Sequence, residues 1–416
     1  MSSSDSVPSS PPPESFAFRH RGFRLYWLAR FLVSFATQII SVAVGWQVYD
    51  ITRNPIDLGV VGLVQFLPSL LLVLITGAAA DRYNRRAIMG LCFALEALVC
   101  AGLILFTWTG DGSVMPIFVL LTLMGVARAF MGPATQSLLP NLVPQADLSN
   151  AIALNSSSWQ FATITGPVAG GLLYGVSAYA AYGSALALLV IGTVLTVMIP
   201  KPVQRASNQA RSLETLFAGF RYVWSEKVVL GAISLDLFAV LLGGATALLP
   251  VYARDILDVG PWGLGLLRAA PGIGALVVAI WLARNAIRDH AGLVMFGFVA
   301  GFGIFTTVFG ASTAVWLSVA GLALAGACDM ISVYVRETLI QLWTPDEVRG
   351  RVNAVNMVFI GASNELGEFR AGLSAAAFGA VPAVVFGGIG TVAVAVLWAI
   401  WFPQLRRIRH LTGKDQ

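Results

Sequence analysis

The sequence predicts an all-α membrane protein whose roughly twelve transmembrane helices form two pseudo-symmetric six-helix bundles. Three observations predict this fold: 57% of the 416 residues are hydrophobic and only 11% are charged, long apolar segments recur from end to end, and the two halves share a weak repeat. A soluble domain carries roughly 25% charged residues, so most of this chain cannot face water. A transmembrane barrel is excluded, because its strands would read as alternating segments of about ten residues.

A helix needs about 20 apolar residues to cross the hydrocarbon core of a bilayer. By this measure the spans cover residues 25–50, 57–80, 87–109, 114–136, 151–175, 177–199, 228–252, 260–283, 291–311, 313–338, 351–377 and 381–402.

The polar segments between these spans predict the domain organisation. The longest one begins at Lys201, between the sixth and seventh spans, and divides the chain into two halves. The Ser/Pro-rich start of the chain has no apolar segment of the kind that a signal peptide needs, so the first span should remain as an anchor. We expect a disordered tail over 1–18, an N-terminal bundle over 19–199, a cytoplasmic linker over 200–226, a C-terminal bundle over 227–405 and a cytoplasmic tail over 406–416.

Basic loop residues lie almost entirely on one side of the predicted membrane. The opposite side has only Arg53 and Arg254. Because Lys and Arg concentrate in cytoplasmic loops, both termini and the linker are predicted to be cytoplasmic, in the inner membrane of a bacterium. The net charge of +5 then fits basic loops against anionic lipid headgroups, and no nucleic-acid partner is expected.

No metal, cofactor or nucleotide site is predicted. Cys92, Cys100 and Cys328 lie inside apolar segments without metal-ligand spacing or nearby histidines. The motifs of metalloproteases, serine hydrolases and nucleotide-binding loops are absent from the sequence, which argues against an intramembrane enzyme and against direct use of ATP. A channel is disfavoured because two repeated halves occur without a short re-entrant filter segment.

The two halves repeat each other in a nearly constant register. Pro144 and Pro345 are 345 − 144 = 201 residues apart, and further upstream Pro68 and Pro271 are 271 − 68 = 203 apart. Parallel repeats of this kind place a substrate site at their interface, near the middle of the bilayer. The sequence therefore predicts a transporter of a small molecule that works by alternating exposure of this site.

The loop after the second span, GAAADRYNRRAIM, resembles the signature loop of the major facilitator superfamily. Its matching positions are Gly77, Asp81, Arg82, Arg85 and Arg86. The segment TGPVAGG in the fifth span resembles a motif associated with antiporters of that superfamily. Its matching positions are Gly166, Pro167, Gly170 and Gly171.

The loop resemblance implies a gate at the cytoplasmic face. The second-half counterpart, LARNAIRDHAG, keeps Arg288 but has Arg284 where the repeat would place the acid. The gating role is therefore expected in the first-half loop alone, with Asp81 as its acid.

Within the superfamily the sequence resembles bacterial drug and siderophore exporters of the enterobactin-exporter type. The segments that carry this resemblance include VPQADLSNAIALNSS, SNELGEFRAG and FPQLRRIRHL. It implies a monomeric, proton-driven antiporter of small amphipathic drugs or siderophore-like molecules, including a multidrug range. The alternatives are a carrier of a lipid or metabolite, including uptake, and, with the least support, an intramembrane enzyme.

Ionisable residues inside the spans are the candidate site residues, because a charge inside a membrane is costly and therefore indicates a function. The acids are Glu96, Asp236, Asp329, Glu365 and Glu368, and the bases are Arg30, Arg128, Arg268 and Arg370. The histidines lie in the tail or in loops, so a transported proton would use carboxylates. We rank Glu368 first for this role, followed by Glu365, Asp236 and Glu96.

Each candidate also has a structural interpretation. Arg30 can extend to the lipid headgroups from the edge of its span. Arg128 and Asp329 are 329 − 128 = 201 residues apart and form either a structural charge pair or substrate contacts. Arg268 and Gln65, 268 − 65 = 203 apart, occupy a polar position that faces the centre in both halves. Glu96 is either a hydrogen-bonded buried acid or a coupling group.

The eleventh span is the most polar candidate. At 100° per residue, Asn364 and Glu368 share one helix face with Asn353 and Asn356, whereas Arg370 points away from that face. Either nearby glycines distort the helix, or Arg370 pairs with a neighbouring helix. A rim position exposed to water is the remaining interpretation of the two acids.

Overall fold

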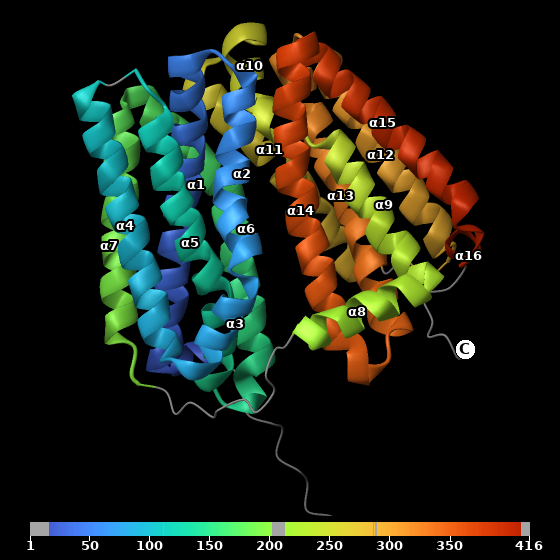
Figure 1. Cartoon of the computed structure of the whole chain (residues 1–416), viewed down its shortest axis with the longest axis horizontal. Coiled ribbons are helices and arrows are strands. Elements are labelled where there is room, and N and C mark those ends of the chain that lie inside the picture. The colour runs from blue at the N-terminus through green and yellow to red at the C-terminus, as the bar shows by residue number, and fades with distance from the viewer. Residues whose placement is uncertain (1–15, 111, 202–212, 286, 288, 409–416) are drawn as a thin grey trace, which may run out of the picture.

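The computed structural model describes residues 16–110, 112–201, 213–285, 287 and 289–408, and all regular secondary structure within these ranges is helical. The all-α prediction is confirmed, and all twelve spans are present (Figure 1). The predicted ninth span, 291–311, coincides with the helix Ala291–Ala311.

The N-terminal bundle contains the first six spans, the second of them divided into two helices. Its helices are α1 (Arg21–Thr52), α2 (Pro55–Leu71), α3 (Val73–Arg82), α4 (Arg85–Thr109), α5 (Met115–Leu138), α6 (Leu148–Val176) and α7 (Ala178–Met198). The division between α2 and α3 falls at Leu72, one turn after Pro68, whose ring lacks the N–H that would continue the helix hydrogen-bond pattern.

The C-terminal bundle contains the other six spans. Its helices are α9 (Lys227–Gly243), α10 (Leu249–Val251), α11 (Gly260–Arg284), α12 (Ala291–Ala311), α13 (Val315–Trp343), α14 (Asp346–Phe378), α15 (Ala380–Trp401) and the short α16 (Pro403–Arg406). Between α9 and α11 the chain forms a 3-10 turn (Thr246–Leu248), α10 and a π-helical turn (Tyr252–Ile256).

The predicted tail and the predicted linker both contain helical residues where they join the bundles. Ala17–Arg19 form a 3-10 turn, and the buried Ala17 donates its N–H to Asn150 Oδ1 at 3.0 Å. The packed chain therefore begins before the predicted boundary at residue 18, because this turn docks on the start of α6. In the predicted linker, α8 (Leu213–Ser225) is a helix that packs on α14 and α9. Residues 1–15, 202–212 and 409–416 lie outside the described chain.

The two bundles lie side by side and diverge toward the end that carries α3 and α8 (Figure 1). We call this end the linker end and the opposite one, where α1 ends and α10 lies, the far end. The bundles meet mainly where α6 packs on α11 and α2 packs on α14. We call this junction the seam.

The apolar core follows the same division. One cluster of buried side chains runs through the N-terminal bundle and continues into the far-end part of the C-terminal bundle, where it includes Leu249, Tyr252 and Ala371. Toward the linker end the C-terminal bundle has separate clusters, around Val335 and around Val352. The bundles thus share a core at the far end and pack independently at the linker end.

Several helices of the seam are shorter or less apolar than the other spans. Within the described residues, nine helical segments are long and apolar enough to cross a membrane, whereas α6, α14 and the divided α2–α3 span are not among them. Because α2, α6 and α14 face the other bundle at the seam, part of each helix surface is covered by protein, which tolerates polar side chains better than lipid does.

Candidate functional site

Two carboxylates of the C-terminal bundle lie at the seam. Glu365 and Glu368 of α14 face Gly62 of α2: a Cβ atom on Gly62 would lie 2.6 Å from Oε2 of Glu365 and 3.0 Å from Oε2 of Glu368. Any other residue at this position would displace the two carboxylates, which are the ends of flexible side chains. The structure therefore places both acids, one turn apart on α14, between the bundles.

Arg268 of α11 joins the bundles beside these acids. Its Nη1 donates a hydrogen bond of 2.6 Å to Ser41 Oγ on α1, across the seam. Glu365 and Glu368 both attract Arg268 electrostatically. The buried Nε of Arg268 has no hydrogen-bond partner among the described residues.

Gln65, which is related to Arg268 by the repeat, has a different role. Its Oε1 accepts a 2.8 Å hydrogen bond from Arg128 Nη1 on α5, and its Nε2 donates to Val61 O at 2.9 Å. Arg128 also attracts Glu365 electrostatically. Of the two interpretations of Arg128 and Asp329, the described residues do not show the direct charge pair, because Arg128 bonds to a neutral amide.

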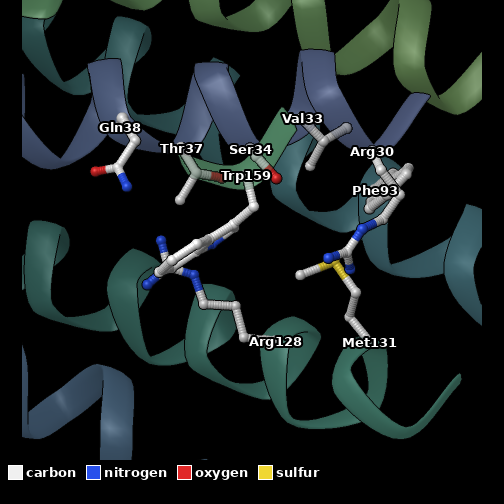
Figure 2. Close-up of a pocket in the computed structure, with 9 residues that line it drawn as sticks. All are labelled: Arg30, Val33, Ser34, Thr37, Gln38, Phe93, Arg128, Met131 and Trp159. Atoms are coloured by element: carbon white, nitrogen blue, oxygen red, sulfur yellow. The ribbon is translucent and has the colours of Figure 1, made fainter. Parts of the chain in front are cut away.

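A cavity of about 140 Å³ lies inside the N-terminal bundle, close to Arg128. Figure 2 shows Arg30 extending from α1 and Arg128 from α5 into the space between these helices. Arg30 thus lines a cavity, which differs from the expected position at the lipid headgroups. The cavity is lined by Arg30, Val33, Ser34, Thr37, Gln38, Phe93, Arg128, Met131 and Trp159, and we call it the arginine pocket.

Glu96 of α4 is completely buried near the arginine pocket. Neither of its carboxylate oxygens has a hydrogen-bond partner among the described residues, so the interpretation as a hydrogen-bonded acid is wrong. Arg128 and Arg30 are the cations that attract it.

Asp236, ranked third as a proton carrier, lies outside the seam. It forms an ion pair with Arg336 of α13, which is only 3% exposed. Helix α9 turns Asp236 into the C-terminal bundle, where Arg336 neutralises it. Asn356 also faces this bundle and donates to Glu337 Oε1 at 2.8 Å.

Arg370 pairs with a neighbouring helix, as one of the two alternatives predicted. Its Nε and Nη2 donate to the carbonyl oxygens of Leu241 and Leu242 at 2.7 and 2.6 Å. These carbonyls lie in the last turn of α9, where free acceptors and the helix dipole favour a cation. Asn364 is exposed and donates to Ile360 O of its own helix, so the predicted polar face of α14 does not form one cluster.

The loop between α3 and α4 is fastened by two arginines. Arg85 is buried and donates to Ala80 O and Ser137 O, both at 3.1 Å, and Arg86 donates to Ile199 O. These bonds tie the loop to the ends of α5 and α7. Gly77 is buried and Arg82 is exposed, whereas the side chain of Asp81 and all of Arg288 lie outside the described chain.

The motif TGPVAGG brings α6 close to both of its neighbours. A Cβ atom on Gly166 would lie 2.6 Å from Gln38 Cβ, and one on Gly170 would lie 3.0 Å from Ile39 Cα, both on α1. Gly171 faces α11, and the motif's Pro167 presents its carbonyl to Gly265 of the same helix. The motif therefore sets the distance between α6, its own bundle and the opposite bundle.

An ion-pair cluster that sequence reasoning missed joins the bundles at the far end. Asp50 pairs with Arg254. Arg53 Nη1 lies 3.3 Å from Oδ1 of Asp255, and Oδ2 of the same residue accepts a hydrogen bond from the Tyr49 hydroxyl. We call these residues the far-end latch. Arg53 and Arg254 are the only two basic loop residues that the sequence analysis assigned to this side of the membrane. An acid lies close to each of them in the sequence, and these acids could have predicted the ion pairs.

Two repeated six-helix bundles with a charged seam between them define a secondary transporter of the major facilitator superfamily. A family model described as "Transmembrane secretion effector" matches residues 14–411, and the chain belongs to this family of the superfamily. Membership confirms the predicted transporter class and excludes the enzyme alternative. The chain is a multi-pass membrane protein.

Relatives confirm the more specific resemblance to enterobactin exporters. The chain is 27% identical over 399 residues to the enterobactin exporter EntS of Citrobacter koseri and 26% identical to that of Escherichia coli O1:K1, with 94% of each chain covered. Among solved structures it is similar to an inward-facing bacterial homologue of the lysosomal transporter Spinster (TM-score 0.68, 14% identity, covering 95% of this chain and 97% of that one). An inward-facing bacterial homologue of the iron transporter ferroportin has the same TM-score at 16% identity, covering 93% and 99%.

Proposed function

We propose that this chain exports small amphipathic, drug-like or siderophore-like molecules from the cytoplasm in exchange for protons, in a bacterial inner membrane. The observation that carries the proposal is the position of Glu365 and Glu368, whose carboxylates lie together where the two bundles meet. The enterobactin exporters among the relatives support the direction of transport and the siderophore-like cargo.

The proposed orientation has the linker end in the cytoplasm, because the basic loop residues gather there. In this orientation the described conformation is inward-open. The far-end latch closes the outer side, and the bundles diverge toward the cytoplasm. Cargo reaches the space between the bundles from the cytoplasm, and export requires the latch to open while the linker end closes.

The coupling step is a change of charge at the seam. A proton that binds Glu365 removes a negative charge that attracts Arg128 of the other bundle, and one that binds Glu368 removes a negative charge that attracts Arg268, which is bonded to Ser41 across the seam. Proton binding therefore changes the electrostatic attraction across the seam, and with it the relative free energies of the two conformations. Asp236 is assigned a structural role, because its ion pair with Arg336 lies within one bundle.

The direct test measures pH-driven transport of iron-free enterobactin by the purified protein in liposomes. Glu368→Gln and Glu365→Gln keep the size and the hydrogen-bonding groups of the side chains but cannot carry a proton. We expect each variant to bind enterobactin and to lose its response to an imposed pH gradient. Glu347→Gln, at the exposed start of α14, is the matched control and should transport normally. Full pH-driven transport in both seam variants would contradict the assignment of these acids.

The orientation is tested separately by cysteine labelling in intact cells. Cysteine at Ser113, in the loop after α4, should react with an impermeant maleimide from outside, and cysteine at Ser207 should react only after the cells are opened. Equal labelling of both from outside would reject the proposed orientation.

A further inference from the structure

We propose that the arginine pocket binds one aromatic ring that carries a single negative charge, such as an aryl carboxylate. This inference rests on the proposed function, since the ring is taken to be part of the exported molecule. It deepens that function by assigning a substrate chemistry to a specific site within the N-terminal bundle.

The charge in the pocket is not balanced by the protein. Arg30 has no ion pair or side-chain hydrogen bond in the described chain, and its buried Nε has no partner. The hydrogen bond of Arg128 goes to the neutral amide of Gln65. Glu96 is the nearby acid, but neither of its oxygens is bonded to either arginine. Within the N-terminal bundle the two cations and Glu96 leave a net charge of +1, which a monoanionic ligand would neutralise in place of Glu365, the acid of the opposite bundle that Arg128 also attracts.

The fork of a guanidinium group matches the two oxygens of a carboxylate, and such charge-assisted hydrogen bonds are among the strongest in proteins. Arg30 and Arg128 are half-buried, and a cation that is partly removed from water gains binding free energy from an anion that reaches it. The hydroxyl groups of Ser34 and Thr37 line the same cavity and can donate further hydrogen bonds.

The rest of the lining is suited to a flat apolar ring. Phe93, Met131 and Trp159 contribute apolar surface, and Trp159 is 53% exposed, so its indole is available to a ligand. The cavity of about 140 Å³ is close in size to an apolar cavity of about 150 Å³ that holds one benzene molecule. Its size, apolar wall and net positive charge together select a single aromatic ring with one anionic group.

The pocket also has a physical link to the seam. Arg128 lines the pocket, bonds to Gln65 and attracts Glu365 of the opposite bundle. An anion bound to Arg128 would therefore compete with Glu365 for the same cation. Because the lining residues belong to the N-terminal bundle alone, the ring would stay with this bundle when the two bundles move.

The test is equilibrium binding of radiolabelled benzoate to the purified, detergent-solubilised protein at one pH and without a gradient. We expect saturable binding that Arg30→Gln and Arg128→Gln each weaken at least about tenfold, as the loss of a charge-assisted hydrogen bond would. Trp159→Leu should weaken it about threefold or more through lost aromatic contact. Arg284→Gln and Trp316→Leu, at exposed positions outside the pocket, should leave it unchanged.

Competition experiments distinguish the two parts of the ligand. Cyclohexanecarboxylate has the charge without the aromatic ring, benzamide has the ring without the charge, and inorganic phosphate is the anion shared with lipid headgroups. We expect each to compete at least about tenfold more weakly than unlabelled benzoate. Equal competition by phosphate or cyclohexanecarboxylate would overturn the aromatic assignment, and equal competition by benzamide would overturn the anionic one.

A second measurement, the protection of a thiol in the pocket from labelling, keeps both arginines in place. Thr37→Cys introduces a thiol into the lining, whereas the native cysteines Cys92, Cys100 and Cys328 are buried. Benzoate should slow the maleimide labelling of this thiol, and unchanged labelling would overturn the proposal. Benzoate binding that survives both arginine substitutions would contradict this inference alone, because the pH-driven transport assay with Glu368→Gln tests the proton coupling independently.

Discussion

Asp50, near the end of α1, pairs with Arg254, in the π-helical turn after α10, so the first span of one bundle is bonded to the first span of the other. Arg254 also lies over the ring of Trp46, with 5.3 Å between its guanidinium carbon and the ring centroid. The pair bridges the bundles at the far end, and it has to break whenever that end opens.

The charge-reversal variant Asp50→Arg should favour opening of the far end, because two arginines then face each other. Partly exposed ion pairs are worth at most about 1 kcal/mol, which corresponds to a several-fold change in the population of the open conformer. Spin labels at Ser113 and Thr313 should report a longer distance in this variant. The double variant Asp50→Arg/Arg254→Asp should restore the original distance, and failure to restore it would show that the pair does not hold this end closed.

Gly62→Ala should disturb the seam while leaving the bundles folded. The added methyl group would meet the carboxylates of Glu365 and Glu368, which are the ends of flexible side chains, and would move them away from α2. We expect a shift away from the inward-open conformer and slower transport. Gly183→Ala on α7 is the matched control, because a Cβ atom at that position meets no other atom within 4 Å. Equal effects of the two substitutions would contradict the close approach at Gly62.

Asp236→Asn should destabilise the folded protein more than it changes coupling. The substitution leaves the buried Arg336 with Glu337 alone, whose Oε1 lies 3.7 Å from its Nε, and breaking a buried pair costs up to about 3–5 kcal/mol. Thermal unfolding in detergent should show a clearly lower midpoint. The apolar double variant Asp236→Leu/Arg336→Met should recover much of the loss and keep its pH response, whereas loss of pH-driven transport in a stable double variant would return Asp236 to the coupling site.

Asp81→Asn tests the gating role that the family resemblance assigns to the first-half loop. An acid at this position can stabilise the exposed N-terminus of α14 when the linker end closes, a contribution of about 0.3–1 kcal/mol. We expect the variant to favour the inward-open conformer and to transport more slowly at unchanged stability. Spin labels at Tyr83 and Glu347, on the two sides of the linker end, measure the conformer populations, and unchanged populations with unchanged transport would remove the gating role.

The sequence predicted the spans well, because hydropathy and length are local properties of the chain. The repeat register also placed Gln65 and Arg268 on corresponding helices. It did not predict that Arg268 crosses the seam to Ser41 while Gln65 stays within its bundle, since side-chain partners depend on which helices become neighbours.

The same limit explains the unpredicted partners of Arg370 and Asp236. Helical periodicity showed that Arg370 points away from Glu368, but only the packing of α14 on α9 identifies the carbonyl groups that it contacts. For Asp236, the burial of Arg336 is decided by the packing of α9 against α13. Neither contact follows from hydropathy or spacing.

The polar character of α14 has a consequence for the biogenesis of the protein. Glu365, Glu368 and Arg370 lie within six residues of one another. Each charge near the centre of a helix raises the free energy of its insertion into the membrane by about 2.5–3.5 kcal/mol. Helix α14 therefore inserts poorly as an isolated segment and needs neighbours that accept these charges. Both are made earlier: α2, which receives the two acids at Gly62, and α9, whose carbonyls receive Arg370. The order of synthesis thus places these partners in the membrane before the most costly helix leaves the ribosome.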